Sequence, residues 1–77
     1  MPVANYQFSG AKLRAAREAA GFTREELAVS SGRAAETIRG YESDRFPIPL
    51  IVARTFAALL GIDLAGLSDN GRGRGRK

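Results

Sequence analysis

Residues 23–42 constrain the fold of this chain more than any other stretch. Thr23 and Glu26 have the Thr-x-x-Glu spacing of a capping box, in which each side chain accepts a hydrogen bond from the other residue's backbone N–H. Gly32 can adopt the left-handed conformation that ends a helix, because it has no β-carbon to clash. The pattern therefore predicts a helix over residues 24–31 that starts at a built-in cap and ends at a glycine turn.

A second helix is predicted over residues 35–42. Ile38 and Tyr41 are three residues apart, so they share one face of such a helix, and their apolar character makes that face the buried one. The positions expected to point outward are Ala35, Glu36, Arg39 and Gly40. Two short helices joined by a glycine turn, with a polar outer face on the second, have the geometry of a helix-turn-helix unit.

With these features the chain resembles the phage repressor and Cro class of helix-turn-helix regulators, also called XRE-like. The matching residues are LRAAREAAGFT (13–23), EELA (25–28), Gly32, Thr37 to Ile38, Tyr41 to Glu42, and ALLGIDLAGL (58–67). The resemblance covers roughly residues 9 to 67. It implies an all-α, compact, lambda-repressor-like domain of four to five helices, in which residues 35–42 form the DNA recognition helix.

Further caps and stops complete the expected helices. Ser9 can cap a helix over residues 10–20, and Pro49 suits the first turn of a later helix that Gly61 stops. Asp63 can cap one more short turn that ends near Leu67. The predicted organisation is an N-terminal arm over 1–8, a helix-turn-helix domain over 9–69 and a flexible basic tail over 70–77.

Composition bounds the function. The chain has 77 residues, enough for one small domain, and it contains neither cysteine nor histidine. Disulfides, the usual zinc sites, thiolate nucleophiles and imidazole catalysis are therefore excluded, and we expect no enzyme, no metal and no cofactor. No apolar run has the length of a membrane span and no signal peptide is evident, so we expect a cytoplasmic protein of a bacterium or of a phage-infected host, acting at the nucleoid.

The expected reading surface for DNA bases is small. Glu36 could accept a hydrogen bond from a cytosine amino group, and Arg39 could donate a bidentate pair to guanine. Ala35 offers only a methyl-sized contact, and Gly40 has no side chain to offer. The alternative is that Glu36 and Arg39, three residues apart, simply pair with each other in solvent.

The family resemblance also implies contacts that carry no sequence information. It assigns phosphate contacts to Arg24, Arg33, Ser43 and Arg45. It further implies an ion pair between Arg17 and Glu42 that ties the first helix to the recognition helix; the alternative is that each arginine is an ordinary solvated charge. The chain departs from the family at Ala34, where a capping Ser or Thr is usual, and at Asp44, where glycine is frequent.

Two places in the C-terminal part of the chain permit more than one interpretation. The apolar residues Ile62, Leu64 and Leu67 either cover the core or, as the resemblance favours, contribute to a twofold dimer interface. The net charge of +4 arises wholly from the tail residues Arg72, Arg74, Arg76 and Lys77, because the remaining basic and acidic side chains cancel. This tail could contact DNA, contact RNA or only aid solubility.

These observations favour a sequence-specific DNA-binding transcriptional regulator that acts as a homodimer on an operator with two half-sites. Its expected partner is double-stranded DNA, without a membrane or a small-molecule ligand. One alternative is an antitoxin-type protein that also holds a toxin protein. Another is a protein-interaction module that kept the two helices but lost base reading.

Overall fold

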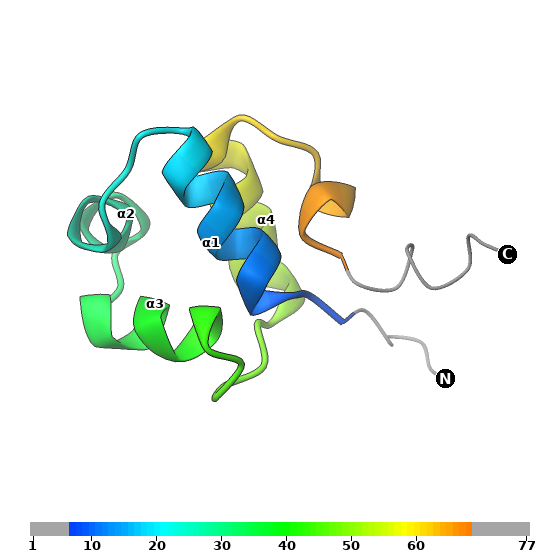
Figure 1. Cartoon of the computed structure of the whole chain (residues 1–77), viewed down its shortest axis with the longest axis horizontal. Helices are drawn as coiled ribbons and strands as arrows, with labels where there is room; N and C mark the ends of the chain where they lie inside the picture. The colour runs from blue at the N-terminus through cyan, green and yellow to red at the C-terminus, as the bar shows by residue number, and fades with distance from the viewer. Residues whose placement is uncertain (1–6, 69–77) are drawn as a thin grey trace, which may run out of the picture.

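The computed structural model describes residues 7–68, which form five helices and no strand within that range. The elements are α1 (Gly10–Ala19), α2 (Arg24–Ser31), α3 (Ala35–Glu42), α4 (Leu50–Leu60) and the 3-10 helix η1 (Leu64–Leu67). In Figure 1, α2 and α3 lie on one side of α1 and α4, and η1 lies on the other. The all-α prediction is confirmed for these residues; most of the predicted arm and the tail over 70–77 lie outside them. None of the helices in residues 7–68 is long and apolar enough to cross a membrane.

Three of the helices end in the same way. The glycines that follow α1, α2 and α4 have positive φ angles of 81°, 73° and 72° (Gly21, Gly32 and Gly61). In each case the next backbone N–H donates back into the last turn, as in Phe22 N to Arg17 O at 3.0 Å and Arg33 N to Ala28 O at 2.9 Å. This pairing satisfies carbonyls that a helix end leaves free. The glycines therefore fix where these helices stop, although α1 ends one residue before the predicted limit.

The helix starts differ from one another. The hydroxyl of Ser9 accepts a hydrogen bond from Lys12 N at 3.2 Å at the start of α1. The capping box of α2 is complete, with Glu26 N donating to Thr23 Oγ1 at 3.0 Å and Thr23 N donating to Glu26 Oε1 at 2.8 Å. Asp63 precedes η1 but makes no side-chain capping bond, so that predicted cap is wrong.

The core lies between α1, α2, α3 and α4 and is closed by η1. Its largest fully buried side chains are Phe56, Leu13, Leu27, Ile38 and Leu67. The Tyr41 ring meets the Phe56 ring edge-on, with 5.9 Å between ring centroids. Because Ile38 and Tyr41 are both buried, the inward face predicted for α3 is confirmed.

The two ends of the described chain meet beside η1. Phe8 and Ser68 form an isolated antiparallel bridge, and Ser9 N donates to Leu67 O at 2.9 Å. The Lys12 ammonium donates to Ser68 O at 2.9 Å. These contacts tie the start of α1 to the end of η1.

Candidate nucleic-acid interface

The outer face of α3 presents two charged side chains to solvent. The side chains of Glu36 and Arg39 are 76% and 63% exposed. Arg39 Nη1 lies 3.9 Å from Glu36 Oε1, a separation too long for a well-formed hydrogen bond. An exposed contact of this kind stabilises a fold by a few tenths of a kcal/mol at most, so both side chains are available to a ligand.

Gly40 does not face outward as predicted. It is buried, and a β-carbon built on it would lie 2.3 Å from the Phe46 ring. The loop after α3 turns back so that Arg45 N and Phe46 N both donate to Gly40 O, at 2.9 and 3.3 Å, and this brings the ring against the helix. The missing side chain of Gly40 therefore serves close packing, and the prediction that it contacts a base is not supported.

Ala35 is also less exposed than predicted. It is partly buried and packs against the hydrophobic core, because it lies one turn before Ile38 on the same side of α3. Of the four residues predicted to face outward, only Glu36 and Arg39 are exposed.

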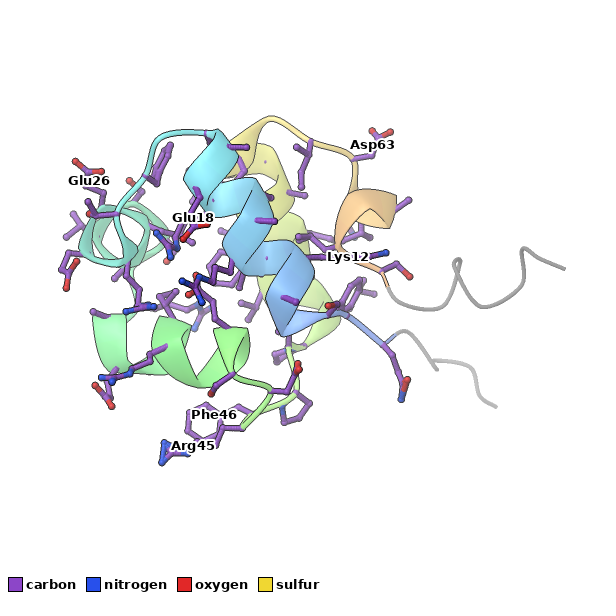
Figure 2. The ribbon with its side chains drawn as sticks, in the orientation of Figure 1. Lys12, Glu18, Glu26, Arg45, Phe46 and Asp63 are labelled. Atoms are coloured by element: carbon purple, nitrogen blue, oxygen red, sulfur yellow. The ribbon has the colours of Figure 1, made fainter. Side chains whose placement is uncertain are left out.

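The loop that covers Gly40 carries an exposed aromatic and an exposed cation. Figure 2 shows Arg45 and Phe46 together at the outer edge of the loop that follows α3. The guanidinium carbon of Arg45 lies 5.8 Å from the centroid of the Phe46 ring, and that ring meets Tyr41 edge-on at 6.3 Å. The glycine in α3 was the available signal for this packing, since a glycine inside a helix usually has a packing reason.

Asp44 occupies the turn position where the family often has glycine. Its φ angle is +62°, which a non-glycine residue adopts at some cost, although Asp tolerates it better than most. Its carboxylate accepts a hydrogen bond from Gly10 N at 3.0 Å, across 34 residues of sequence. The negative charge therefore sits at the positive end of α1, where the helix dipole favours it.

A buried ion pair fastens α3 to α1. Arg17 Nε lies 2.6 Å from Glu42 Oε2, and the two side chains are only 7% and 4% exposed. Arg17 Nη1 also donates to Phe22 O at 2.8 Å. The hydrogen bond to Glu42 raises the pKa of Arg17, so the guanidinium stays charged. The structure thus brings together the two residues that the family resemblance paired.

Arg24 at the start of α2 joins this pair. Its Nε lies 3.2 Å from Glu42 Oε1, so the carboxylate is shared between two arginines. One third of the Arg24 side chain remains exposed. The sequence did not predict this contact, because Arg24 and Glu42 are 18 residues apart.

The remaining predicted phosphate contacts lie at the two ends of α3. Arg33 is exposed in the turn before the helix, and Ser43 and Arg45 are exposed in the loop after it. The Ser43 hydroxyl donates to Gly40 O at 3.2 Å. Cationic and polar groups thus flank the exposed face of α3 on both sides.

The predicted dimer residues have different surroundings. Leu67 is fully buried in the core of its own chain, so its assignment to a dimer interface is wrong. Ile62 and Leu64 are partly buried and pack against that core. Large exposed apolar side chains instead occur near the start of α4, at Phe46, Leu50 and Ile51. The four tail residues predicted to contact DNA, Arg72, Arg74, Arg76 and Lys77, lie outside the described residues.

Comparisons with known proteins agree with this geometry. No protein with a curated description matches the chain. Among solved structures, the restriction-modification controller protein C.AhdI from Aeromonas hydrophila is 30% identical, with a TM-score of 0.70, and the match covers 74% of this chain and 86% of that one. The clp gene regulator ClgR from C. glutamicum is 28% identical, with a TM-score of 0.70 over 73% of each chain.

A more distant structure shares the fold. The master regulator for biofilm formation SinR, solved in complex with DNA, is 21% identical, with a TM-score of 0.67 over 73% of this chain and 90% of that one. A family model described as a helix-turn-helix domain matches residues 10–69. The chain therefore belongs to the helix-turn-helix domain family, among the Cro/XRE-like transcription regulators.

Proposed function

We propose that this protein is a sequence-specific DNA-binding regulator that places α3 in the major groove. The observation that carries the proposal is the division of α3 into two faces. Ile38 and Tyr41 are buried, whereas Glu36 and Arg39 project into solvent and contribute little to the fold. A helix fits the major groove of B-DNA, where an arginine can recognise guanine and a glutamate can accept a hydrogen bond from cytosine.

The surroundings of α3 support the same orientation. Arg24, Arg33, Ser43 and Arg45 lie around its ends, so they can contact phosphates on both sides of the groove that α3 enters. Phosphate contacts of this kind fix the register of a protein on the duplex, and base contacts then supply the specificity. The similarity to a controller protein and to a gene regulator agrees with this function.

Base reading by Arg39 can be tested directly. The wild-type protein is first used to select a duplex from a random library. The affinities of the wild-type protein and of Arg39→Ala for that duplex are then compared at about 150 mM salt, with competitor DNA present. We expect Arg39→Ala to lose about 1 to 3 kcal/mol of binding free energy and to accept other bases at one position of the site. Arg54→Ala, which removes an exposed arginine from α4, is the matched control and should change little.

Two results would contradict this assignment. An equal loss of affinity on every sequence would make Arg39 a phosphate contact only. Failure of the wild-type protein to prefer any duplex over competitor would leave the protein-interaction module as the better function.

We further propose that two copies bind an operator with two half-sites about 34 Å apart. Phe46, Leu50 and Ile51 follow one another through the loop and the first turn of α4, and all three are exposed. A second copy would remove this apolar surface from water, which favours association. Binding to bacterial or phage DNA would place the protein at the nucleoid.

The mass of the particle in solution tests this second proposal. Ile51→Glu should shift the protein and its DNA complex toward the monomer, whereas Val29→Glu, at an exposed apolar residue of α2, should not. A monomeric wild-type protein at high concentration, both alone and on DNA, would exclude the dimer. A toxin-like partner protein that protects Ile51 instead of a second copy would favour the antitoxin alternative.

A further inference from the structure

A surface hollow of about 210 Å³ lies where α1, α2 and α3 approach one another. It is lined by Arg14, Arg24, Arg39, Glu42 and Ser43. Three of these five residues are arginines, and they come from three different helices. Arg14 lies outside the predicted recognition helix, and no sequence pattern assigns it a function.

The charge of the hollow is positive. The one carboxylate in its lining belongs to Glu42 and is already paired with Arg17, whose Nε lies 2.6 Å from Glu42 Oε2. Arg17 itself is not part of the lining. Arg24 also bonds to that carboxylate, at 3.2 Å. The guanidinium groups of Arg14, Arg24 and Arg39 therefore leave a net excess of positive charge that an anion would balance.

Arg14 can turn toward the hollow at small cost. Its Nε lies 3.1 Å from Glu18 Oε2, but both side chains are more than half exposed. Figure 2 shows Glu18 on the side of α1 that faces α2, and its partner Arg14 is one of the residues that line the hollow. Exposed pairs of this kind are weak and are screened by salt, so Glu18 competes only weakly with a phosphate.

We propose that this hollow binds a phosphate group of the DNA backbone, and that Arg14 of α1 holds it together with Arg24 and Ser43. A guanidinium presents paired N–H donors that match phosphate oxygens. The Ser43 hydroxyl, which donates to Gly40 O at 3.2 Å, adds a donor to the phosphate once it rotates away from that carbonyl. The hollow opens beside the exposed Arg39 of α3, so a duplex that places a base edge at Arg39 brings its backbone past Arg14. This inference rests on the proposed function and extends the interface from the two helices α2 and α3 to α1.

The salt dependence of binding tests the role of Arg14. Each phosphate contact contributes about 0.9 to the slope of log K against log salt concentration on B-DNA. We expect Arg14→Ala to lower the slope by about that amount and to weaken specific and non-specific binding by the same factor, whereas Arg54→Ala leaves the slope unchanged. Glu18→Gln, which removes the competing carboxylate, should strengthen binding. A slope for Arg14→Ala equal to that of the wild type would overturn the proposal.

Replacing single backbone phosphates with neutral methylphosphonates locates the contact. At one position of the duplex, the modification should weaken the wild-type protein more than it weakens Arg14→Ala, in which only Arg24 and Ser43 remain to hold the phosphate. If Arg39→Ala relaxes the base preference while no position shows this coupling, the phosphate site is wrong and the proposed function stands.

If the protein binds no duplex, a titration with inorganic phosphate tests the phosphate site separately from the proposed DNA-binding function. Shifts of the backbone amide signals of Arg14, Arg24 and Ser43 that disappear in Arg14→Ala would show a phosphate site that serves a free anion. The absence of any shift in the wild-type protein, together with no duplex binding, would overturn both proposals.

Discussion

The two central helices, α2 and α3, have equal lengths but are held in place differently. Each contains eight residues. Helix α2 begins with a complete capping box, in which Thr23 and Glu26 satisfy each other's backbone N–H groups. Ala34, which precedes helix α3, makes no side-chain capping bond. The start of α2 is thus encoded locally, whereas the start of α3 is not.

Contacts from other parts of the chain hold α3 instead. Arg17 of α1 binds Glu42 near its end, and Gly10 lies so close that a β-carbon there would be 2.3 Å from Tyr41 O. The Phe46 ring covers Gly40 from the following loop. The helix proposed to read DNA is therefore positioned by tertiary packing, and its orientation depends on α1.

The largest expected effect is that of removing the link between α1 and α3. Arg17→Ala should lower the free energy of unfolding by about 3 kcal/mol, because it leaves the buried Glu42 carboxylate with Arg24 alone. Thermal unfolding measures this loss. Arg14→Ala is the control, since its exposed pair with Glu18 should change the stability by less than about 0.5 kcal/mol. Equal losses of stability in the two variants would contradict the claim that contacts from α1 hold α3 in place.

The pH dependence of the same variant follows from the sign of the pKa shift. The pKa of Arg17 is raised in the folded protein by its hydrogen bond to Glu42. A raised pKa stabilises the fold fully below the unfolded pKa, and the contribution is lost only as the pH rises through the folded pKa. Both values lie in the strongly alkaline range. The titration of Arg17 should therefore add no pH dependence to its stabilising effect between about pH 6 and about pH 9.

A second large effect is expected at the close approach of α1 and α3. Gly10→Ala should cost about 2 kcal/mol, because its β-carbon would meet the backbone oxygens of Tyr41 and Glu42, which cannot rotate away. Gly66→Ala is the control, since its nearest neighbour is a side-chain atom of Ile62 at 3.5 Å. Urea unfolding of the two variants compares them. A neutral Gly10→Ala would mean that α1 does not position α3.

A smaller effect is expected at the cap of α2. Thr23→Ala removes one half of the capping box and should cost about 1 kcal/mol. Hydrogen exchange should show the loss at the first turn of α2, at the amide of Glu26, with little change in α3. Thr55→Ala, within α4, removes a threonine that caps nothing and should cost less. If Thr23→Ala increased hydrogen exchange equally in α2 and α3, the claim that the cap acts only on the start of α2 would be contradicted.

The smallest effect is a gain. Ala34→Ser supplies the missing cap of α3 and should add about 0.5 kcal/mol to the free energy of unfolding. Ala58→Ser places the same hydroxyl on an exposed site inside α4, where it should not stabilise. Thermal unfolding distinguishes them. If Ala34→Ser left the free energy of unfolding unchanged, the tertiary contacts of α3 would already hold its first turn so firmly that a cap adds nothing.

Local signals explain which parts of the fold could be predicted. The bounds of α2 match the prediction because Thr23 and Gly32 act on residues within one turn of themselves. The bounds of α3 match as well, although no side-chain cap marks its start. The buried face of α3 was also predictable, because the spacing of Ile38 and Tyr41 determines it. At the interface, the same spacing predicted the exposure of Glu36 and Arg39.

Contacts between distant residues explain the rest. The prediction that Gly40 faces outward was wrong because the Phe46 ring packs over it. No periodicity within α3 encodes the path of the loop that carries Phe46. Asp44 stands where the family often has glycine, and its bond to Gly10, 34 residues away, is not encoded in the residues around it. Leu67 has the same apolar character whether it faces a partner or its own core, so only the packing of η1 distinguishes the two.

The bridge between Phe8 and Ser68 has a consequence for engineering. Because the polypeptide enters and leaves the fold at adjacent points on the η1 side, a short linker could join them without crossing the molecule. New ends opened at the exposed glycine turn before η1 would then give a circularly permuted protein with the same core. For the same reason, a label or a second domain joined directly at residue 7 or at residue 68 would begin its path on the side of the molecule opposite α2.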